Sequence, residues 1–350
     1  MNNTTANNDP ESYHRPILEV LDKVSPFDLG NIVVHILVDS TGIFLNSLLL
    51  CIIIFYTPKY MAVYKVLLVN NTLIELLTSL LSLFIIQRYL PIGLNQLIQA
   101  NYGICQLFGN TACFCGWMVL EHCITQSALS LLLSFCYRYY VLYNSKPRRS
   151  QVYIALVIFS VPSALSFINL AFMYDDPTTL REIALKTYPN YYIDAATITG
   201  FKKVDENPQM SFSILFICAA VPATYPFIFF LRHKILKRVE ERQYSETTKR
   251  LHFDLLKALT IQTILPGFYY IGVTAFYLIS FGYLNHPFTE NLILFSVAII
   301  PVISPFVSFF FITPYKEQLS VMCKIAKCKK ANKISVDSNI VTDCEVQGSL

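Results

Sequence analysis

The sequence places polar and ionisable side chains inside long apolar stretches. Acids stand in three such stretches, at Asp39, Glu75 and Glu121. An acid in this setting marks a binding site, an ion or proton site, or a polar contact between helices. The sequence shows no nucleophile–histidine–acid grouping at readable spacing, no HExxH, no Gly-rich phosphate loop and no CxxC pair. We therefore expect a protein that is not an enzyme and that has no cofactor and no metal site.

A single arginine stands near the end of a long apolar run. Leu129–Tyr143 reads LSLLLSFCYRYYVLY, with Arg138 between Tyr137 and Tyr139. A lone cation among aromatic rings at the end of an apolar helix suits a membrane–water interface, because the rings lie at the headgroups while the guanidinium reaches water or phosphate. The pattern has two interpretations: a charge that stops a membrane helix, or a switch on the cytoplasmic face.

The elements that position these residues are predicted to be membrane helices. The chain is 54% hydrophobic and 14% charged, whereas ordinary soluble domains are roughly 25% charged. Each of seven apolar segments is long enough to cross a bilayer, which needs about 20 helical residues. We predict an all-α membrane protein, a seven-transmembrane helix bundle in a lipid bilayer, with spans at about 31–56, 66–90, 106–142, 152–173, 210–231, 255–280 and 291–313.

The basic residues predict the orientation of the bundle. Twenty of the 27 Lys and Arg residues fall in one set of loops and the C-terminal tail. Basic residues favour the cytoplasmic side, so the N-terminus is expected outside, and the C-terminus and Arg138 inside. The domains are then an extracellular segment 1–30, a seven-helix domain 31–315 and a cytoplasmic tail 316–350. The uneven placement of the cations argues against nucleic-acid binding.

Both end segments carry modification motifs. Asn2 and Asn3 begin overlapping N-glycosylation motifs on the predicted outer side. After Thr313–Lys316, the stretch EQLSVMCKIAKCKK predicts a short amphipathic helix on the inner leaflet. Cys323 and Cys328 lie there beside lysines and are candidates for palmitoylation, with unmodified thiols as the alternative.

A pocket is expected in the outer half of the bundle. Glu121 precedes Arg138 by 17 residues, which is about 25 Å of helix. An inward-facing acid at that depth lines a pocket open to the outside. The predicted pocket residues, with helix-packing roles as the alternative, are Asp39, Trp117, Glu121, His122, Tyr269 and Tyr270.

A second polar group is expected near the middle of the membrane. Asn46 and Glu75 lie in consecutive spans, which usually pack side by side. We predict an intramembrane polar cluster of Asn46, Asn71, Glu75 and Ser304, joined by hydrogen bonds or around an ion. The alternative is a protonated Glu75 that only holds helices together.

Three passages resemble one family of receptors. They are SFCYRYYVL at the end of span three, LHFDLLKALTIQTILPGFYY at the start of span six, and PVISPFVSFFFITPYK at the end of span seven. The chain resembles the nematode chemoreceptors of the Str superfamily, most closely serpentine receptor class delta, which are seven-transmembrane G-protein-coupled receptors. The resemblance implies an odorant- or pheromone-like small-molecule ligand, a heterotrimeric G protein and a plasma membrane, often that of a sensory-neuron cilium. Whether receptors form dimers is left open.

The resemblance also assigns a G-protein switch. Arg138 falls at the arginine that such receptors use in activation, and Pro266 at the proline that would hinge span six. Tyr137, Tyr139 and Tyr315 complete the expected switch, Tyr315 as part of the aromatic–basic exit from span seven. The loop 232–257 is predicted to extend spans five and six as helices, either as a solvated charged face or as a G-protein contact surface.

The sequence departs from the common receptor pattern in two places. The residue before Arg138 is Tyr137 and not an acid, which implies a looser resting lock. The second outer loop, 174–209, contains no Cys, so the usual bridge from span three cannot form there. Cys105–Cys113 is a substitute only if Cys105 lies in a loop, because bridged Cα atoms must lie within about 7 Å.

The loop 174–209 is too long for a simple connector and is either a lid over the pocket or partly disordered.

Two other membrane functions compete with the receptor. A ligand-gated cation channel of the insect odorant receptor type predicts the opposite topology, with the N-terminus inside. A transporter predicts related halves or broken, Gly-rich helices at mid-membrane. The sequence shows neither, and only 11 of its residues are glycine.

Overall fold

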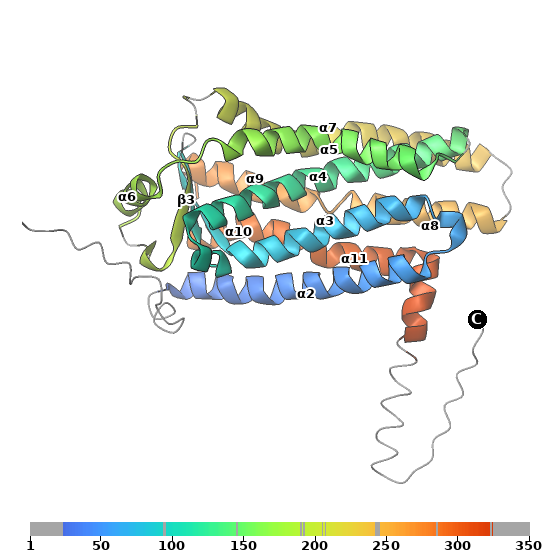
Figure 1. Ribbon diagram of the computed structural model, residues 1–350, viewed down its shortest axis with the longest axis horizontal. Coiled ribbons are helices and arrows are strands. Elements are labelled where there is room, and N and C mark those ends of the chain that lie inside the picture. The colour runs from blue at the N-terminus through green and yellow to red at the C-terminus, as the bar shows by residue number, and fades with distance from the viewer. Residues whose placement is uncertain are drawn as a thin grey trace, which may run out of the picture.

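The computed structural model describes residues 24–93, 96–144, 146–189, 191, 193–204, 206, 208–241, 246–284, 286–322 and 324. Helical rods lie side by side along the long axis of the molecule, with a small sheet at one end (Figure 1). We call the end that carries this sheet the sheet end and the opposite end the Arg138 end. The rods are α2 (Pro26–Tyr56), α3 (Tyr64–Ile85), α4 (Asn110–Tyr143), α5 (Arg149–Ala171), α7 (Pro208–Glu241), α8 (Glu246–Gln262) followed by α9 (Gly267–Ser280), and α10 (Pro287–Ala298) followed by α11 (Ile300–Phe311).

These rods correspond to the seven predicted spans. Within the described residues, six segments are long and apolar enough to cross a membrane by length and composition. The remaining predicted span, 210–231, lies within the 34 residues of α7. Two rods are interrupted. The four residues 263–266 separate α8 from α9, and one residue, Ile299, separates α10 from α11.

The predicted second span is too long at its C-terminal end. Helix α3 ends at Ile85, Ile86 takes a left-handed conformation with φ of 32°, and β1 (Gln87–Ile92) follows. The prediction that residues up to 90 are helical is therefore wrong. A β-branched residue with positive φ cannot continue a helix, and the chain turns there into a strand that pairs with β2 (Gln96–Asn101).

The predicted third span begins too early. Residues Ile104–Phe108 form the short 3-10 helix η3, and α4 starts only at Asn110. Gly109 separates them with φ of 90°, a conformation that glycine adopts without steric cost. Cys105 therefore lies in a connecting segment and not on the helix that carries Cys113.

The loop 174–209 supplies ordered structure to the sheet end. It contains α6 (Pro177–Thr187), the 3-10 turn η4 (Ile193–Ala195) and β3 (Thr197–Phe201). The three strands form an antiparallel sheet in the order β1-β2-β3, with Gln87 opposite Asn101 and Asn101 opposite Thr197. Strand β1 packs against α9 and α10 and β3 packs against α4, so the sheet covers helix ends. Of the two alternatives for this loop, its described part fits the lid.

Two predictions concern the Arg138 end. Helix α7 continues to Glu241 and α8 begins at Glu246, which confirms that the 232–257 stretch extends the helices. Residues 313–322 are helical, and in Figure 1 this short red helix turns away from the bundle after α11. Its amphipathic character and its contact with the membrane stay predictions. The predicted modification sites Asn2, Asn3, Cys323 and Cys328 lie outside the described residues.

Candidate functional site

A cavity of about 380 Å³ lies inside the bundle near the sheet end. Helices α4, α7, α9 and α10 supply its sides, while Tyr89 of β1 and Leu97 of β2 supply part of its cover. Most of the lining is apolar or aromatic and includes Ile124, Leu170, Ile214, Val273, Phe276 and Val297. Sites for small organic molecules are roughly 300–1,000 Å³ and have a similar lining with few polar groups. The cavity is therefore large enough for a small organic molecule.

One wall of the cavity is polar. The indole Nε1 of Trp117 donates to Glu121 Oε1 at 3.1 Å and to the hydroxyl of Tyr89 at 2.9 Å. The Tyr89 hydroxyl in turn donates to the same Glu121 Oε1 at 3.1 Å. Trp117 and Glu121 are four residues apart and thus share one face of α4, while Tyr89 reaches them from the sheet. These three residues form what we call the polar corner.

The structure divides the six predicted pocket residues into two halves. Trp117, Glu121 and Tyr269 line the cavity. The lining of this cavity does not include the other three: Asp39, His122 and Tyr270.

These three residues contact other side chains outside the cavity. Asp39 is fully buried between α2 and α3, where its Oδ2 lies 3.0 Å from His35 Nδ1 and accepts from Ser82 Oγ at 2.8 Å. Neighbouring residues on a helix point about 100° apart, so His122 points away from the direction that Glu121 takes. Its ring lies 6.0 Å from that of Phe167 on α5. The ring of Tyr270 lies 6.3 Å from that of Tyr225 on α7.

Sequence reasoning missed Tyr89 because it was assigned to a membrane span. It also missed the cavity residues that come from other elements, such as Leu97 and Cys218. A signal was available for Tyr89: Gln87 and Arg88 interrupt the apolar run, and Pro91 and Gly93 follow within a few residues. Such punctuation is typical of a strand followed by a turn.

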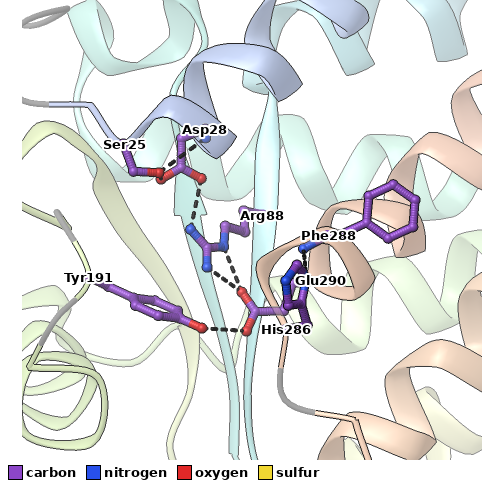
Figure 2. Close-up of polar contacts among 7 residues, drawn as sticks. All are labelled: Ser25, Asp28, Arg88, Tyr191, His286, Phe288 and Glu290. Atoms are coloured by element: carbon purple, nitrogen blue, oxygen red, sulfur yellow. Dashed lines mark hydrogen bonds and ion pairs between the residues drawn. The ribbon is translucent and has the colours of Figure 1, made fainter.

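A buried arginine holds four segments together at the sheet end. Figure 2 shows Arg88 between two carboxylates: its Nη1 lies 2.8 Å from Asp28 Oδ1 on α2, and its Nη2 lies 2.5 Å from Glu290 Oε2 on α10. Its Nε also donates to Glu290, at 2.6 Å. The ring of Tyr191 stacks 4.3 Å from the guanidinium carbon, and the hydroxyl of Tyr191 donates to Glu290 Oε1 at 3.0 Å. We call Asp28, Arg88, Tyr191 and Glu290 the Arg88 cluster.

Charge and burial make the Arg88 cluster a closed unit. The side chain of Arg88 is 3% exposed, and those of Asp28 and Glu290 are 1% exposed. Burial by itself lowers the pKa of Arg88, but the charges of Glu290 and Asp28 outweigh it and raise the pKa overall. Burial, helped by the negative charge of Glu290, raises the pKa of Tyr191 to about 12, so its hydroxyl stays a hydrogen-bond donor. No residue of this cluster was among the predicted site residues.

A disulfide bond links Cys105 of η3 to Cys113 of α4, with Cα atoms 4.9 Å apart. The bridge that the sequence left open is therefore present. It ties the connection after β2 to the start of α4, next to the cavity wall that Trp117 supplies.

The intramembrane polar residues do not share one network. Asn46 Nδ2 donates to the carbonyl of Pro301 at 2.7 Å, a carbonyl that Pro305 leaves without its usual helical N–H donor. Glu75 is instead hydrogen-bonded to Ser304, and both line a cavity of about 30 Å³ with Asn71. The predicted pairing of Asn46 with Glu75 is thus replaced by an interhelical bond that repairs a proline site.

A similar repair occurs next to Pro266. Tyr225 of α7 donates its hydroxyl proton to the carbonyl of Thr263 at 2.8 Å, while the backbone N–H of Gly267 bonds to Ile264. Pro266 itself caps α9 and stands in the interruption between α8 and α9. The rod is therefore jointed at the position where a hinge was predicted.

Arg138 has aromatic neighbours and no acid. Its guanidinium carbon lies 4.0 Å from the ring centre of Tyr64, and that ring stacks on Tyr137 with centroids 5.6 Å apart. Its Nε and Nη2 atoms are buried without a hydrogen-bond partner, and no ion pair reaches it within the part of the chain that the structure describes. A guanidinium over an aromatic face gains a cation–π interaction. Tyr64 was not a predicted site residue.

The other residues of the predicted switch surround this end. Tyr139 packs against Tyr143 with ring centroids 4.6 Å apart, and Arg238 of α7 lies 4.9 Å over the Tyr143 ring. Tyr315 is fully buried, and its hydroxyl lies 3.0 Å from Thr57 Oγ1 just after α2. Tyr315 thus fastens the 313–322 helix to the bundle.

Comparison with known proteins relates the chain to one receptor family. The family profile described as Serpentine type 7TM GPCR chemoreceptor Srd matches residues 31–321. In Caenorhabditis elegans, Serpentine receptor class delta-18 is 33% identical over 284 residues, covering 79% of this chain and 84% of that protein. Serpentine receptor class delta-19 of the same organism is 32% identical over 284 residues, covering 79% and 83%. The crystal structure of squid rhodopsin has a similar fold, with a TM-score of 0.64, 13% identity and coverage of 92% of this chain and 94% of that chain.

Proposed function

Because this chain belongs to the Srd family of serpentine class delta chemoreceptors, we propose that it binds an external odorant- or pheromone-like small molecule in the cavity at its sheet end and activates a heterotrimeric G protein at its Arg138 end. It is a multi-pass membrane protein of the G-protein-coupled receptor class and not an enzyme. The ligand site, the coupling and the orientation are the parts that we propose.

One observation carries the proposal: a single helix joins the cavity to the arginine. Helix α4 is unbroken from Asn110 to Tyr143. It presents Trp117 and Glu121 to the cavity and Arg138 to the other end of the bundle. A ligand that packs on the polar corner therefore touches the same rigid element that holds the switch residue.

The joint in the sixth rod supplies the motion. Tyr269 and Val273 of α9 line the cavity, and α8 beyond Pro266 packs against α4 and α11. Arg232 of α7 donates to Thr260 of α8 at 3.2 Å, so α7 and α8 are held together close to the joint. In the proposed active state, ligand contact with α9 tilts α8 outward, which exposes Arg138 and the ends of α7 and α8 to the G protein.

The proposed orientation places the sheet end outside the cell. The uneven distribution of Lys and Arg supports it. The Cys105–Cys113 disulfide also supports it, because disulfides persist in oxidising surroundings outside the cytoplasm. An efficient glycosylation acceptor inserted before Pro26 should be modified in cells; an unmodified acceptor would favour the inverted topology of the channel alternative.

The switch role is tested by a receptor variant in a G-protein reporter cell. We expect a mixture of secreted small molecules to activate the wild type, and Arg138→Ala to abolish the response while surface delivery persists. Arg149→Ala, which removes an exposed arginine at the same end, is the matched control and should respond normally. Full signalling by Arg138→Ala would contradict the proposed switch.

The cellular location is a separate proposal. We propose that the receptor resides in the plasma membrane of a sensory-neuron cilium, as the family resemblance implies. A fluorescent fusion expressed from its own promoter should concentrate at the ciliary tip of chemosensory neurons, and uniform labelling of non-neuronal cells would contradict it.

A further inference from the structure

The chemistry of the cavity wall restricts what the cavity can hold. Glu121 is the only Asp or Glu in the lining, and no Lys, Arg or His lines the cavity among the described residues. Five aromatic rings surround the space, from Tyr89, Trp117, Tyr269, Phe276 and Tyr277. A charge brought into such an apolar site needs an opposite charge at contact distance. The wall offers that to a cation and denies it to an anion.

The hydrogen bonds of the polar corner point to the same class of ligand. Trp117 and Tyr89 both direct their hydrogens to Glu121 Oε1, so neither donor is free for an acceptor group on a ligand. The described residues give Glu121 Oε2 no hydrogen-bond partner, although the side chain faces the cavity. Glu121 Oε2 is therefore the free hydrogen-bond acceptor of the polar corner, and it can bind a donor group on a ligand.

We propose that the cavity takes a small amphiphile with a positively charged amine, which is held by Glu121 Oε2, and an aromatic or aliphatic body, which fills the apolar remainder. This inference rests on the proposed function, because it assumes that the cavity is the ligand site. The rings beside Glu121 add cation–π attraction to the ion pair. A carboxylate ligand of the same size finds no cationic side chain among the lining residues to pair with.

Three probes with the same indole body test the proposal: tryptamine, tryptophol and indole-3-propionate, which end in an ammonium, a hydroxyl and a carboxylate. Binding is measured by the thermal shift of purified receptor, since a ligand of the folded state raises Tm. We expect tryptamine to bind at least about tenfold more tightly than tryptophol, as one added ion pair suffices for that ratio, and the propionate to bind least.

The variant Glu121→Gln keeps the shape of the corner and removes the charge. It should weaken the binding of tryptamine at least about tenfold. The affinity for tryptophol should stay within about threefold of the wild type, because only the amine pairs with the charge of Glu121. Glu182→Gln, which removes an exposed acid from α6, is the matched control and should bind like the wild type.

Several outcomes overturn the ligand class. They are equal binding of the three probes, preference for the propionate, no binding of tryptamine, or an affinity for tryptamine that is the same in Glu121→Gln as in the wild type. The assay contains no G protein, so its result is separate from that of the coupling test. Glu121-dependent binding with silent reporter cells would contradict the coupling and leave the ligand class standing.

A different observation bears on how a molecule reaches the cavity. The sheet end is covered, since Tyr89 and Val204 line the cavity while being only 6% and 9% exposed. On the side between α7 and α9, the lining residues Leu215 and Tyr277 are 64% and 38% exposed. They are the two exposed residues of the cavity lining, so we take the wall to be thinnest between α7 and α9.

We infer that the cavity opens to the bilayer between α7 and α9, so that the ligand enters from the lipid. Both helices cross the membrane in the predicted arrangement, and the side of the bundle therefore faces acyl chains. An amphiphilic ligand concentrates at that interface, with its body among the chains and its charge at the headgroups. Cys218 lines the cavity behind this opening and serves as a reporter.

Labelling of Cys218 in membranes tests the lateral opening. We expect the lipophilic reagent benzyl methanethiosulfonate to modify Cys218 faster than the uncharged, water-soluble 2-hydroxyethyl methanethiosulfonate. The larger side chain in Leu215→Trp should slow the lipophilic reagent several-fold. Phe212→Trp, at a residue of α7 that is 66% exposed and outside the cavity lining, should not.

Mass spectrometry resolves the label at Cys218 from that at Cys115, an exposed free thiol that serves as the internal reference. Thermal denaturation of Leu215→Trp separates a blocked opening from a misfolded protein. Faster labelling of Cys218 by the water-soluble reagent, or an unchanged rate for the lipophilic reagent in a folded Leu215→Trp receptor, would overturn the lateral route in favour of access through the sheet end.

Discussion

Two arginines with buried guanidinium atoms lie at opposite ends of the bundle, and their surroundings differ in kind. Arg88 at the sheet end has two carboxylates and a tyrosine ring, and its ion pairs measure 2.8 and 2.5 Å. Arg138 has a tyrosine ring 4.0 Å away, and two of its nitrogens are buried without a partner among the described residues. Arg88 thus has two ion pairs, and Arg138 has none among the described residues.

This difference in charge pairing implies that the two ends differ in rigidity. Removing one partner from a buried, paired charge costs about 3–5 kcal/mol, whereas a cation–π contact contributes about 0.5–2 kcal/mol. The sheet end also carries a disulfide and a three-stranded sheet. We therefore expect a rigid sheet end that holds the cavity in shape and an Arg138 end that rearranges at low cost.

The largest effect is expected from Arg88→Ala. It leaves Asp28 and Glu290 buried side by side without a cation, and should cost about 3–5 kcal/mol of stability. The melting temperature of purified receptor and its surface delivery are the measurements, with Arg149→Ala as the exposed control. Unchanged stability of Arg88→Ala would remove the basis for a rigid sheet end.

The Cys105–Cys113 disulfide should contribute less to the stability of the fold than Arg88 does. Cys105 and Cys113 are separated by 8 positions, and closing a loop of that size is worth about 2–3 kcal/mol by chain entropy. Cys113→Ser should lower the melting temperature accordingly, and reductant should then have no further effect. Cys115→Ser, which removes an exposed free thiol two positions away, is the control. Equal melting of both variants would mean that this end does not depend on the bridge.

The hydroxyl of Tyr191 tests whether the loop 174–209 is part of the rigid end. Tyr191→Phe keeps the ring over Arg88 and removes the hydrogen bond to Glu290, which should cost about 1.5 kcal/mol since the acceptor is charged. Amide hydrogen exchange of β3 should increase along with the loss in melting temperature. Unaltered exchange would show that the loop is held without this contact.

The two ends also differ in how far the sequence predicted them. The helices, the joint at Pro266 and the extension of α7 and α8 follow from apolar runs, prolines and charge pattern, which are local signals. Arg88 escaped prediction because its partners Asp28 and Glu290 lie 60 and 202 residues away, and no local pattern reports such a pairing. The strand that carries Arg88 directly follows an apolar run that Gln87 and Arg88 interrupt, and the predicted span was extended across this interruption to residue 90.

The cavity residues also show that local sequence patterns do not report contacts between distant segments. Trp117 and Glu121 could be predicted together because four residues make one helical turn. Tyr89 completes their hydrogen-bond network from a strand, and Asp39 and His122 failed as pocket residues because depth in the membrane does not say which way a side chain points. Likewise Asn46 was expected to meet Glu75, but the carbonyl left open by Pro305, 255 residues away at Pro301, provided a better partner.

The smallest change in stability, and the most informative about function, is expected from Tyr64. Tyr64→Leu removes the only ring stacked over Arg138 among the described contacts, which should weaken the resting state by about 1 kcal/mol. A shift of that size changes a two-state ratio about fivefold, so signalling without ligand should rise by up to that factor in reporter cells. Tyr64→Phe keeps the ring and should signal like the wild type, which separates the stacked contact from the hydroxyl. If both variants stayed silent without ligand, the ring would not hold Arg138 at rest. The contrast between a paired and an unpaired arginine would then describe packing alone and not activation.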